Sequence, residues 1–133
     1  MPLVLTKPLA DLKAAAGAEV DRLAGEIRAR YITVSPGQEV TYALKRAEAA
    51  AYIAAAYPAD ATAYPWIAAE ATATGKTPAQ AADRIAEKAA EWVAIGSQIE
   101  GARQAAKAAI SAASSAADIW AAKAAFVAAV EGL

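Results

Sequence analysis

Residues 77–113 decide the fold, and they read TPAQAADRIAEKAAEWVAIGSQIEGARQAAKAAISAA. The stretch opens on Thr77, Pro78 and Gln80, which form a capping box: threonine as the N-cap, proline at the first helical position and glutamine at the third. No breaker follows before about residue 113. We therefore predict a helix of roughly 35 residues, about 50 Å long at 1.5 Å per residue.

Small and apolar residues recur along this helix at coiled-coil spacing, namely Ile85, Ala89, Trp92, Gly96, Ile99, Ala106 and Ile110. Arg103 breaks the pattern. Such a seam is better explained if another helix covers it, so we expect the chain to self-associate. Gly96 and Gly101 each weaken the helix by about 1 kcal/mol relative to alanine, and whether it bends between them stays open.

Two helices are predicted within residues 6–56. The first spans about residues 6–30, with Thr6 as its N-cap and Pro8 in its first turn. Its apolar stripe consists of Leu9, Leu12, Ala16, Val20, Leu23, Ile27 and Tyr31. Residues 31–34 favour an extended backbone, and Ser35-Pro36-Gly37 signals a turn. The second helix spans about residues 38–56, and its stripe consists of Val40, Leu44, Ala47 and Ala51. Residues 6–56 are therefore expected to form an antiparallel helical hairpin.

Residues 57–77 are predicted to be a connector with a short helix. Pro58 disfavours the α region for Tyr57 and so ends the second helix. The short helix spans about residues 63–74, with Pro65 in its first turn and Gly75 as its left-handed stop.

Residues 78–133 then hold the long helix and a shorter C-terminal one. A second cap-like sequence introduces the latter, formed by Ser114, Ser115 and Asp118. Its apolar positions are Ile119, Trp120, Phe126, Val127 and Val130. We thus expect an all-α, bundle-like single domain over residues 1–133, with about five helices and a coiled-coil-like seam.

Composition restricts the classes of function. Hydrophobic residues make up 58% of the chain, and most of them are alanine, the strongest helix former. Because 13 basic and 14 acidic residues leave a net charge of −1, we expect no nucleic-acid binding. Cysteine and histidine are absent, which removes the thiolate nucleophile and the commonest general base and metal ligand. The start of the chain lacks a signal-peptide pattern, and no apolar run is long enough to insert into a membrane.

Two polar sequences imitate functional sites. Thr74-Gly75-Lys76-Thr77 resembles the end of a phosphate-binding loop, but Glu70 stands where that motif needs a glycine, so we interpret the sequence as a helix stop and a cap. Glu87 and Glu91, with Asp83, lie on one helix face among basic residues, and Glu48 lies beside Lys45 and Arg46. We interpret both groups as solvated surface charges. We therefore predict no catalytic residue, no cofactor and no metal site.

The aromatic residues carry more information, because tyrosine and tryptophan suit surfaces where an apolar body meets a polar rim. Intramolecular packing, a protein interface and sugar binding all remain open for them. The candidate interface consists of Tyr42, Tyr52, Tyr57, Tyr64, Trp66, Trp92, Ile99 and Trp120.

One pattern resembles a known group of proteins. It comprises Arg28-Ala29-Arg30-Tyr31-Ile32-Thr33, Pro36-Gly37-Gln38, Thr41-Tyr42, Lys45, Tyr64-Pro65-Trp66-Ile67-Ala68-Ala69-Glu70-Ala71, Thr74-Gly75, Trp92, Ile99-Glu100 and Arg103. In order and spacing these residues resemble small alanine-rich proteins encoded among the tail and tail-fibre genes of bacteriophages and prophages, over about residues 9–133. The resemblance implies a role in the virion or its assembly and offers no catalytic residues.

The first hypothesis is a bacteriophage tail structural protein, a helical subunit at the tail fibre or tail tip that packs against other tail proteins. It would be made in the host cytoplasm and would reside in the virion. The alternatives are a tail-fibre assembly chaperone and a small helical regulator or inhibitor that binds a host protein. We do not expect an enzyme.

Overall fold

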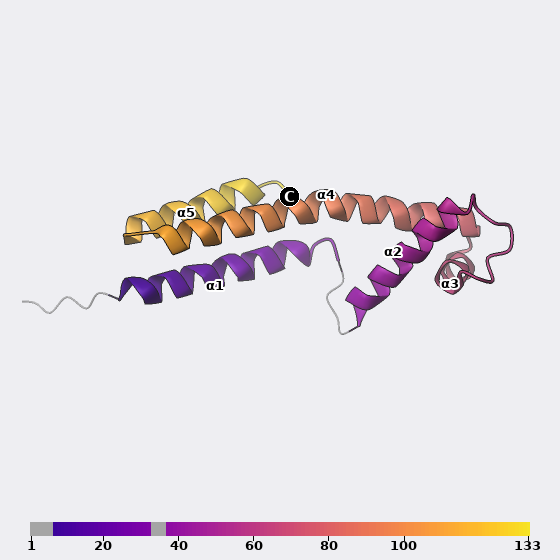
Figure 1. The fold of residues 1–133 in the computed structure, drawn as a ribbon, viewed down its shortest axis with the longest axis horizontal. Helices are drawn as coiled ribbons and strands as arrows, with labels where there is room; N and C mark the ends of the chain where they lie inside the picture. The colour runs from indigo at the N-terminus through magenta and orange to yellow at the C-terminus, as the bar shows by residue number, and fades with distance from the viewer. Residues whose placement is uncertain (1–6, 33–36) are drawn as a thin grey trace, which may run out of the picture. The chain divides into compact units, whose positions relative to one another are not determined.

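The computed structural model describes residues 7–32 and 37–133, and within these residues it contains five helices and no strand. The helices are α1 (Leu9–Arg28), α2 (Gln38–Ala54), α3 (Pro65–Thr74), α4 (Pro78–Ala112) and α5 (Ala116–Val130), drawn in Figure 1. The all-α prediction is confirmed. The proposed N-cap Thr6 and most of the extended segment and turn at 33–36 lie outside the described residues.

The contacts divide the chain into two compact units. Unit 1 comprises residues 7–32 and Ile95–Leu133. Unit 2 comprises residues 37–94. Helix α4 therefore contributes its first half to unit 2 and its second half to unit 1. Because α1 and α2 belong to different units, the helical hairpin over residues 6–56 stays a prediction.

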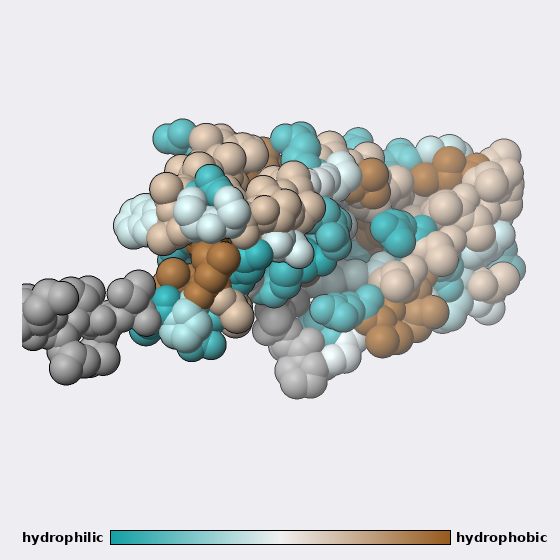
Figure 2. Space-filling model, turned by 60° about the vertical axis from the view of Figure 1, so that its left-hand side comes forward, coloured by the Kyte–Doolittle hydropathy of each residue, from teal (hydrophilic) through white to brown (hydrophobic). Residues whose placement is uncertain are grey.

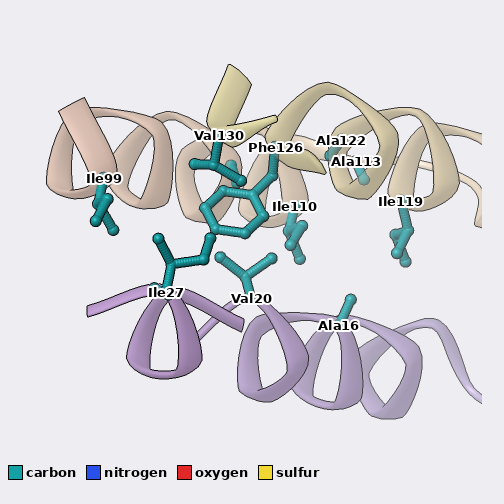
Figure 3. Packing of buried hydrophobic residues seen from close by; sticks show 12 residues of the cluster. Ala16, Val20, Ile27, Ile99, Ile110, Ala113, Ile119, Ala122, Phe126 and Val130 are labelled. Carbon is teal, nitrogen blue, oxygen red and sulfur yellow. The ribbon is translucent and has the colours of Figure 1, made fainter. Parts of the chain in front are cut away.

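Unit 1 is a three-helix bundle of α1, the second half of α4, and α5. Helices α1 and α5 run in the same direction, and α4 runs opposite to both (Figure 1). Phe126 of α5 lies at the centre of the core, facing Val20 and Ile27 of α1 and Ile110 of α4 (Figure 3). At the far end of α1, Arg30 Nη1 donates a hydrogen bond to the carbonyl oxygen of Leu133 at 3.2 Å. Helices from both ends of the chain thus share one core.

The stripe predicted for α1 is largely confirmed. Ala16, Val20 and Ile27 are buried, and the three leucines of the stripe pack against the core while partly buried. Tyr31 lies beyond the helix and is exposed. The helix begins at Leu9, with Pro8 as its N-cap residue, whereas we predict Pro8 inside the first turn.

Four residues of the α4 seam are buried within the chain, whereas Ala89, Trp92 and Gly96 are half-buried. Ile99, Ala106 and Ile110 lie in the core of unit 1, whereas Ile85 lies in the core of unit 2. Other helices of the same chain therefore cover these four positions, which give no argument for self-association. The helix continues through Gly96 and Gly101.

The caps predicted at Thr77 and Ser115 and the helix stop predicted at Gly75 are confirmed. The Gln80 amide N–H donates to Thr77 Oγ1 at 3.1 Å, and Thr77 N–H donates to Gln80 Oε1 at 3.0 Å, so the capping box is complete. Ser115 Oγ accepts a hydrogen bond from the amide of Asp118 at 3.2 Å. Gly75 ends α3 with φ of 67°, in the left-handed region that glycine favours. These local signals fix where the helices begin and end.

The stripe predicted for α2 is wrong. Val40 and Leu44 are 64% and 47% exposed, and Ala47 and Ala51 are exposed as well. The buried residues of this helix are Ala49 and Tyr52, which join the core of unit 2 with Ile67 and Ala71 of α3 and with Ala81, Ala82 and Ile85 of α4. The side chain of Tyr52 has more apolar surface to bury than that of Val40 or Leu44. The face of α2 that carries Tyr52 therefore packs in the core of unit 2.

Helix α2 ends in a Schellman motif without glycine. The amide of Tyr57 donates to the carbonyl of Tyr52 at 3.2 Å, and that of Ala56 donates to the carbonyl of Ile53 at 2.9 Å. Ala56 and Tyr57 both have positive φ, 62° and 56°. Such values disfavour a residue with a Cβ atom, so the end of α2 holds strained backbone.

We expect Ala56→Gly to stabilise the protein by up to about 1 kcal/mol, because glycine adopts positive φ without the steric cost of a Cβ atom. Ala55→Gly is the matched control: Ala55 has a φ of −81°, so glycine there only adds freedom to the unfolded chain and destabilises. Urea denaturation measures both. Equal destabilisation by the two variants would show that residue 56 is unstrained.

Phe126→Ala is expected to cost about 3–5 kcal/mol in the free energy of unfolding, because it leaves a cavity at the centre of unit 1. Trp120→Ala, on the same helix but 74% exposed, is expected to stay within about 0.5 kcal/mol of the wild type. The comparison uses chemical denaturation followed by circular dichroism. A large loss from Trp120→Ala would contradict the exposed position of its side chain.

Candidate protein-binding surface

The eight candidate interface residues fall in different environments. Tyr52 and Ile99 are buried in the cores of units 2 and 1, so they add nothing to the surface. Tyr64 and Trp92 are half-buried. The exposed members are Tyr42, Tyr57, Trp66 and Trp120. The structure thus does not gather the eight residues into one patch: Ile99 and Trp120 belong to unit 1 and the others to unit 2.

Three of the tyrosines form a packed cluster in unit 2. The Tyr52 ring meets the rings of Tyr57 and Tyr64 edge to face, with centroids 5.9 Å and 5.1 Å away. Tyr52 Oη donates to the carbonyl of Pro58 at 2.7 Å, and Tyr57 Oη donates to Asp83 Oδ1 at 2.6 Å. The bond to Asp83 raises the pKa of Tyr57. These tyrosines pack within the chain, holding the strained end of α2 against α4.

Glu48 and Lys45 are structural residues, so their interpretation as solvated surface charges is wrong. Glu48 Oε2 accepts a hydrogen bond from the amide of Ile67 at 2.7 Å, in the first turn of α3. The N-cap of α3, Tyr64, makes no side-chain cap bond, so a carboxylate from α2 supplies it and also complements the helix dipole. Lys45 Nζ lies 2.7 Å from Glu70 Oε2, and both side chains are about three-quarters buried. These contacts attach α3 to α2.

Charged residues bridge α1 and α4 in unit 1. Arg103 lies 2.9 Å from both Glu100 and Asp21, Lys107 lies 2.8 Å from Asp21, and Arg28 lies 2.9 Å from Glu100. Arg103 is only 23% exposed and connects the two helices. The sequence indicates this role only by the charged residue at position 103, which interrupts an otherwise apolar seam. Asp21 and Arg28 of α1 are thus paired with charges of α4.

Hydrogen bonds from Arg103 and Gln104 and the nearby Arg103 and Arg28 charges lower the pKa of Glu100 to about 2, and Lys107 and Arg103 lower that of Asp21. Because the folded pKa lies below the ordinary 4.5, the stabilisation is present above that value and is lost as the pH falls toward about 2. We expect Glu100→Gln to be less stable at pH 7 and to lose less stability on acidification. Denaturant titrations at several pH values measure this.

Val93→Ala is the control for this experiment, since it changes an exposed, uncharged residue of the same helix. It should keep the acid dependence of the wild type. Identical acid profiles for Glu100→Gln and the wild type would show that Glu100 makes no such contribution.

The most exposed large apolar side chains of unit 1 lie on α5. Trp120 is 74% and Val127 is 51% exposed, and alanines occupy most of the remaining outward positions of this helix. Figure 2 looks toward the end of unit 1 where α4 passes into α5, and the pale brown of alanine covers much of its upper part. We call the outward residues Ala117, Trp120, Ala121, Ala124, Val127 and Ala128 the α5 surface.

The charge beside the α5 surface is already paired. Lys123 Nζ lies 3.1 Å from Glu19 Oε2 of α1 and 5.8 Å from the centre of the Trp120 ring. The contact lowers the pKa of Glu19. A shallow hollow of about 160 Å³ lies next to it, between Leu12 and Ala16 of α1 and Ile119 and Trp120 of α5. The arrangement offers an apolar surface with an aromatic ring at its edge, which suits contact with protein.

The remaining sequence interpretations concern chemistry. Gly75 and Thr77 act as the helix stop and the cap, as predicted, and Asp83, Glu87 and Glu91 are exposed on α4. Across residues 7–32 and 37–133 there is no cluster of side chains that could hold a metal ion. Nor does this part of the chain include a helix of the length and apolar character that a membrane span requires.

Comparison with protein-family models, curated proteins and solved structures finds no match to this chain.

Proposed function

We propose that this chain is a bacteriophage tail structural protein, a helical subunit at the tail fibre or tail tip that acts by packing against other tail proteins. The phage setting comes from the resemblance of its sequence to small proteins of tail gene clusters. Under this proposal the chain is made in the host cytoplasm, resides in the virion, and performs no catalysis.

The observation that supports a packing role is the composition of α5. From Ile119 to Val130 its only charged residue is Lys123, which is paired with Glu19. A helix that is apolar all round is normally covered on both sides, yet α5 is covered by α1 and α4 on one side only. Trp120 is the kind of side chain that contributes most to binding when a partner buries it. A protein partner on the α5 surface would complete the burial.

The α2 stripe is also exposed, and it serves as the comparison surface for the α5 surface. Val40 and Leu44 are exposed one turn apart and are followed by exposed alanines. The α5 surface has the larger side chain and the fewer charges, and we assign the principal contact to it.

Mass spectrometry of purified virions tests the structural role, and we expect this chain in particles at a fixed copy number. Absence from finished particles would overturn the structural role and favour the assembly chaperone, which shields a partner's apolar surface and then leaves. A chain absent from particles and bound as a monomer to a host protein would favour the regulator.

A charged variant connects the role to the surface. Trp120→Glu places a charge on an exposed position, so we expect a folded protein that is lost from virions. Val40→Glu, at a position 64% exposed on α2, is the matched control and should still be incorporated. Incorporation of Trp120→Glu at the wild-type level would show that the α5 surface is not the principal contact.

A further inference from the structure

We propose that the α5 surface binds the same surface of a second copy of this chain, with the two α5 helices antiparallel about a two-fold axis near Ala124. This inference rests on the binding role proposed for the α5 surface and names its partner. It is independent of the α4 seam, four residues of which are buried in the cores of the chain.

Charge selects a partner of this kind. The α5 surface carries no charged residue, and the two charges beside it have partners within the chain: Lys123 is paired with Glu19, and Asp118 accepts hydrogen bonds from Ser114. A charged partner surface would lose its hydration on docking and find no counter-charge in return. A second α5 surface has no charged residue that docking would bury without a partner. The net charge of −1 also leaves little long-range repulsion between two copies.

The order of side-chain sizes is self-complementary. Trp120, Ala124 and Val127 follow at intervals of four and three residues, so they lie along one side of the helix. In a two-fold antiparallel pair each contact occurs twice, and Trp120 of one copy faces Ala128 of the other and packs beside its Val127. Ala124 then meets Ala124 at the axis, where its small side chain allows the helices to approach closely. The tryptophans cover the two ends of the contact.

The size of the surface sets the strength of the pair. Helix α5 has 15 residues and is about 22 Å long and roughly 10 Å wide. The contact is therefore well below the ~800 Å² per partner of a standard protein interface. We infer a weak dimer, with a dissociation constant of micromolar order or weaker, which forms at high local concentration.

The absence of cysteine allows a direct test by cross-linking. In full-length Ala124→Cys, the two thiols meet at the axis, within the separation that a disulfide bridges, so mild oxidation should give a covalent dimer. Ala47→Cys, an exposed alanine on α2, is the matched control and should cross-link much more slowly. Adding Trp120→Glu to Ala124→Cys should remove the cross-link. Equal cross-linking of Ala124→Cys and Ala47→Cys would overturn the inference.

Sedimentation equilibrium of cysteine-free proteins gives a second measurement. The mass of the wild type should rise toward that of a dimer with concentration, and Trp120→Glu should weaken the association about thirtyfold or more. Val40→Glu should associate like the wild type. A wild type that stays monomeric at millimolar concentration would overturn the inference.

The outcomes separate this inference from the proposed function. If Trp120→Glu is lost from virions but Ala124→Cys does not cross-link, the α5 surface binds a different tail protein and the dimer is overturned. If Ala124→Cys cross-links but the chain is absent from particles, the dimer stands and the structural role in the tail is overturned.

Discussion

The single methyl group of alanine sets the distance at which the helices of this chain meet. Burying a methyl stabilises a fold by a fraction of the roughly 1.5–3 kcal/mol that a buried large apolar side chain contributes. Because about half of the buried core residues are alanine, the fold needs close helices and large residues among them. Among the described residues, Phe126 has this role in unit 1 and Tyr52 with Ile67 in unit 2.

The same constraint explains how charge is distributed. Alanine helices offer few polar groups, so the charges that do occur in unit 1 are concentrated between α1 and α4, where Asp21, Glu100 and Arg103 connect the two helices. Helix α5 is left almost without charge and shows its apolar residues to solvent. Ion pairs thus connect α1 and α4, whereas α5 leaves apolar side chains exposed.

Most helix ends were predictable because their signals are local. The pair Thr77 and Gln80, the cap at Ser115 and the stop at Gly75 each act within one turn of backbone. The buried face of α2 was not predictable in this way, because it depends on what α3 and α4 present to Tyr52. The same holds for Glu48, which caps a helix 19 residues further along the chain. Of the candidate interface, Trp120 is exposed as a contact residue must be, whereas Ile99 serves the core.

Helix α4 belongs to both units, so the two cores share one helix when the chain folds. The part from Pro78 to Ala94 lines the core of unit 2, and the part from Ile95 to Ala112 lines that of unit 1. Nucleating a helix is the costly step, whereas extending it by another residue is nearly free in an alanine-rich sequence. Whichever core forms first therefore supplies a template from which the helix grows into the other. The backbone hydrogen bonds of one continuous helix therefore link the folding of the two cores.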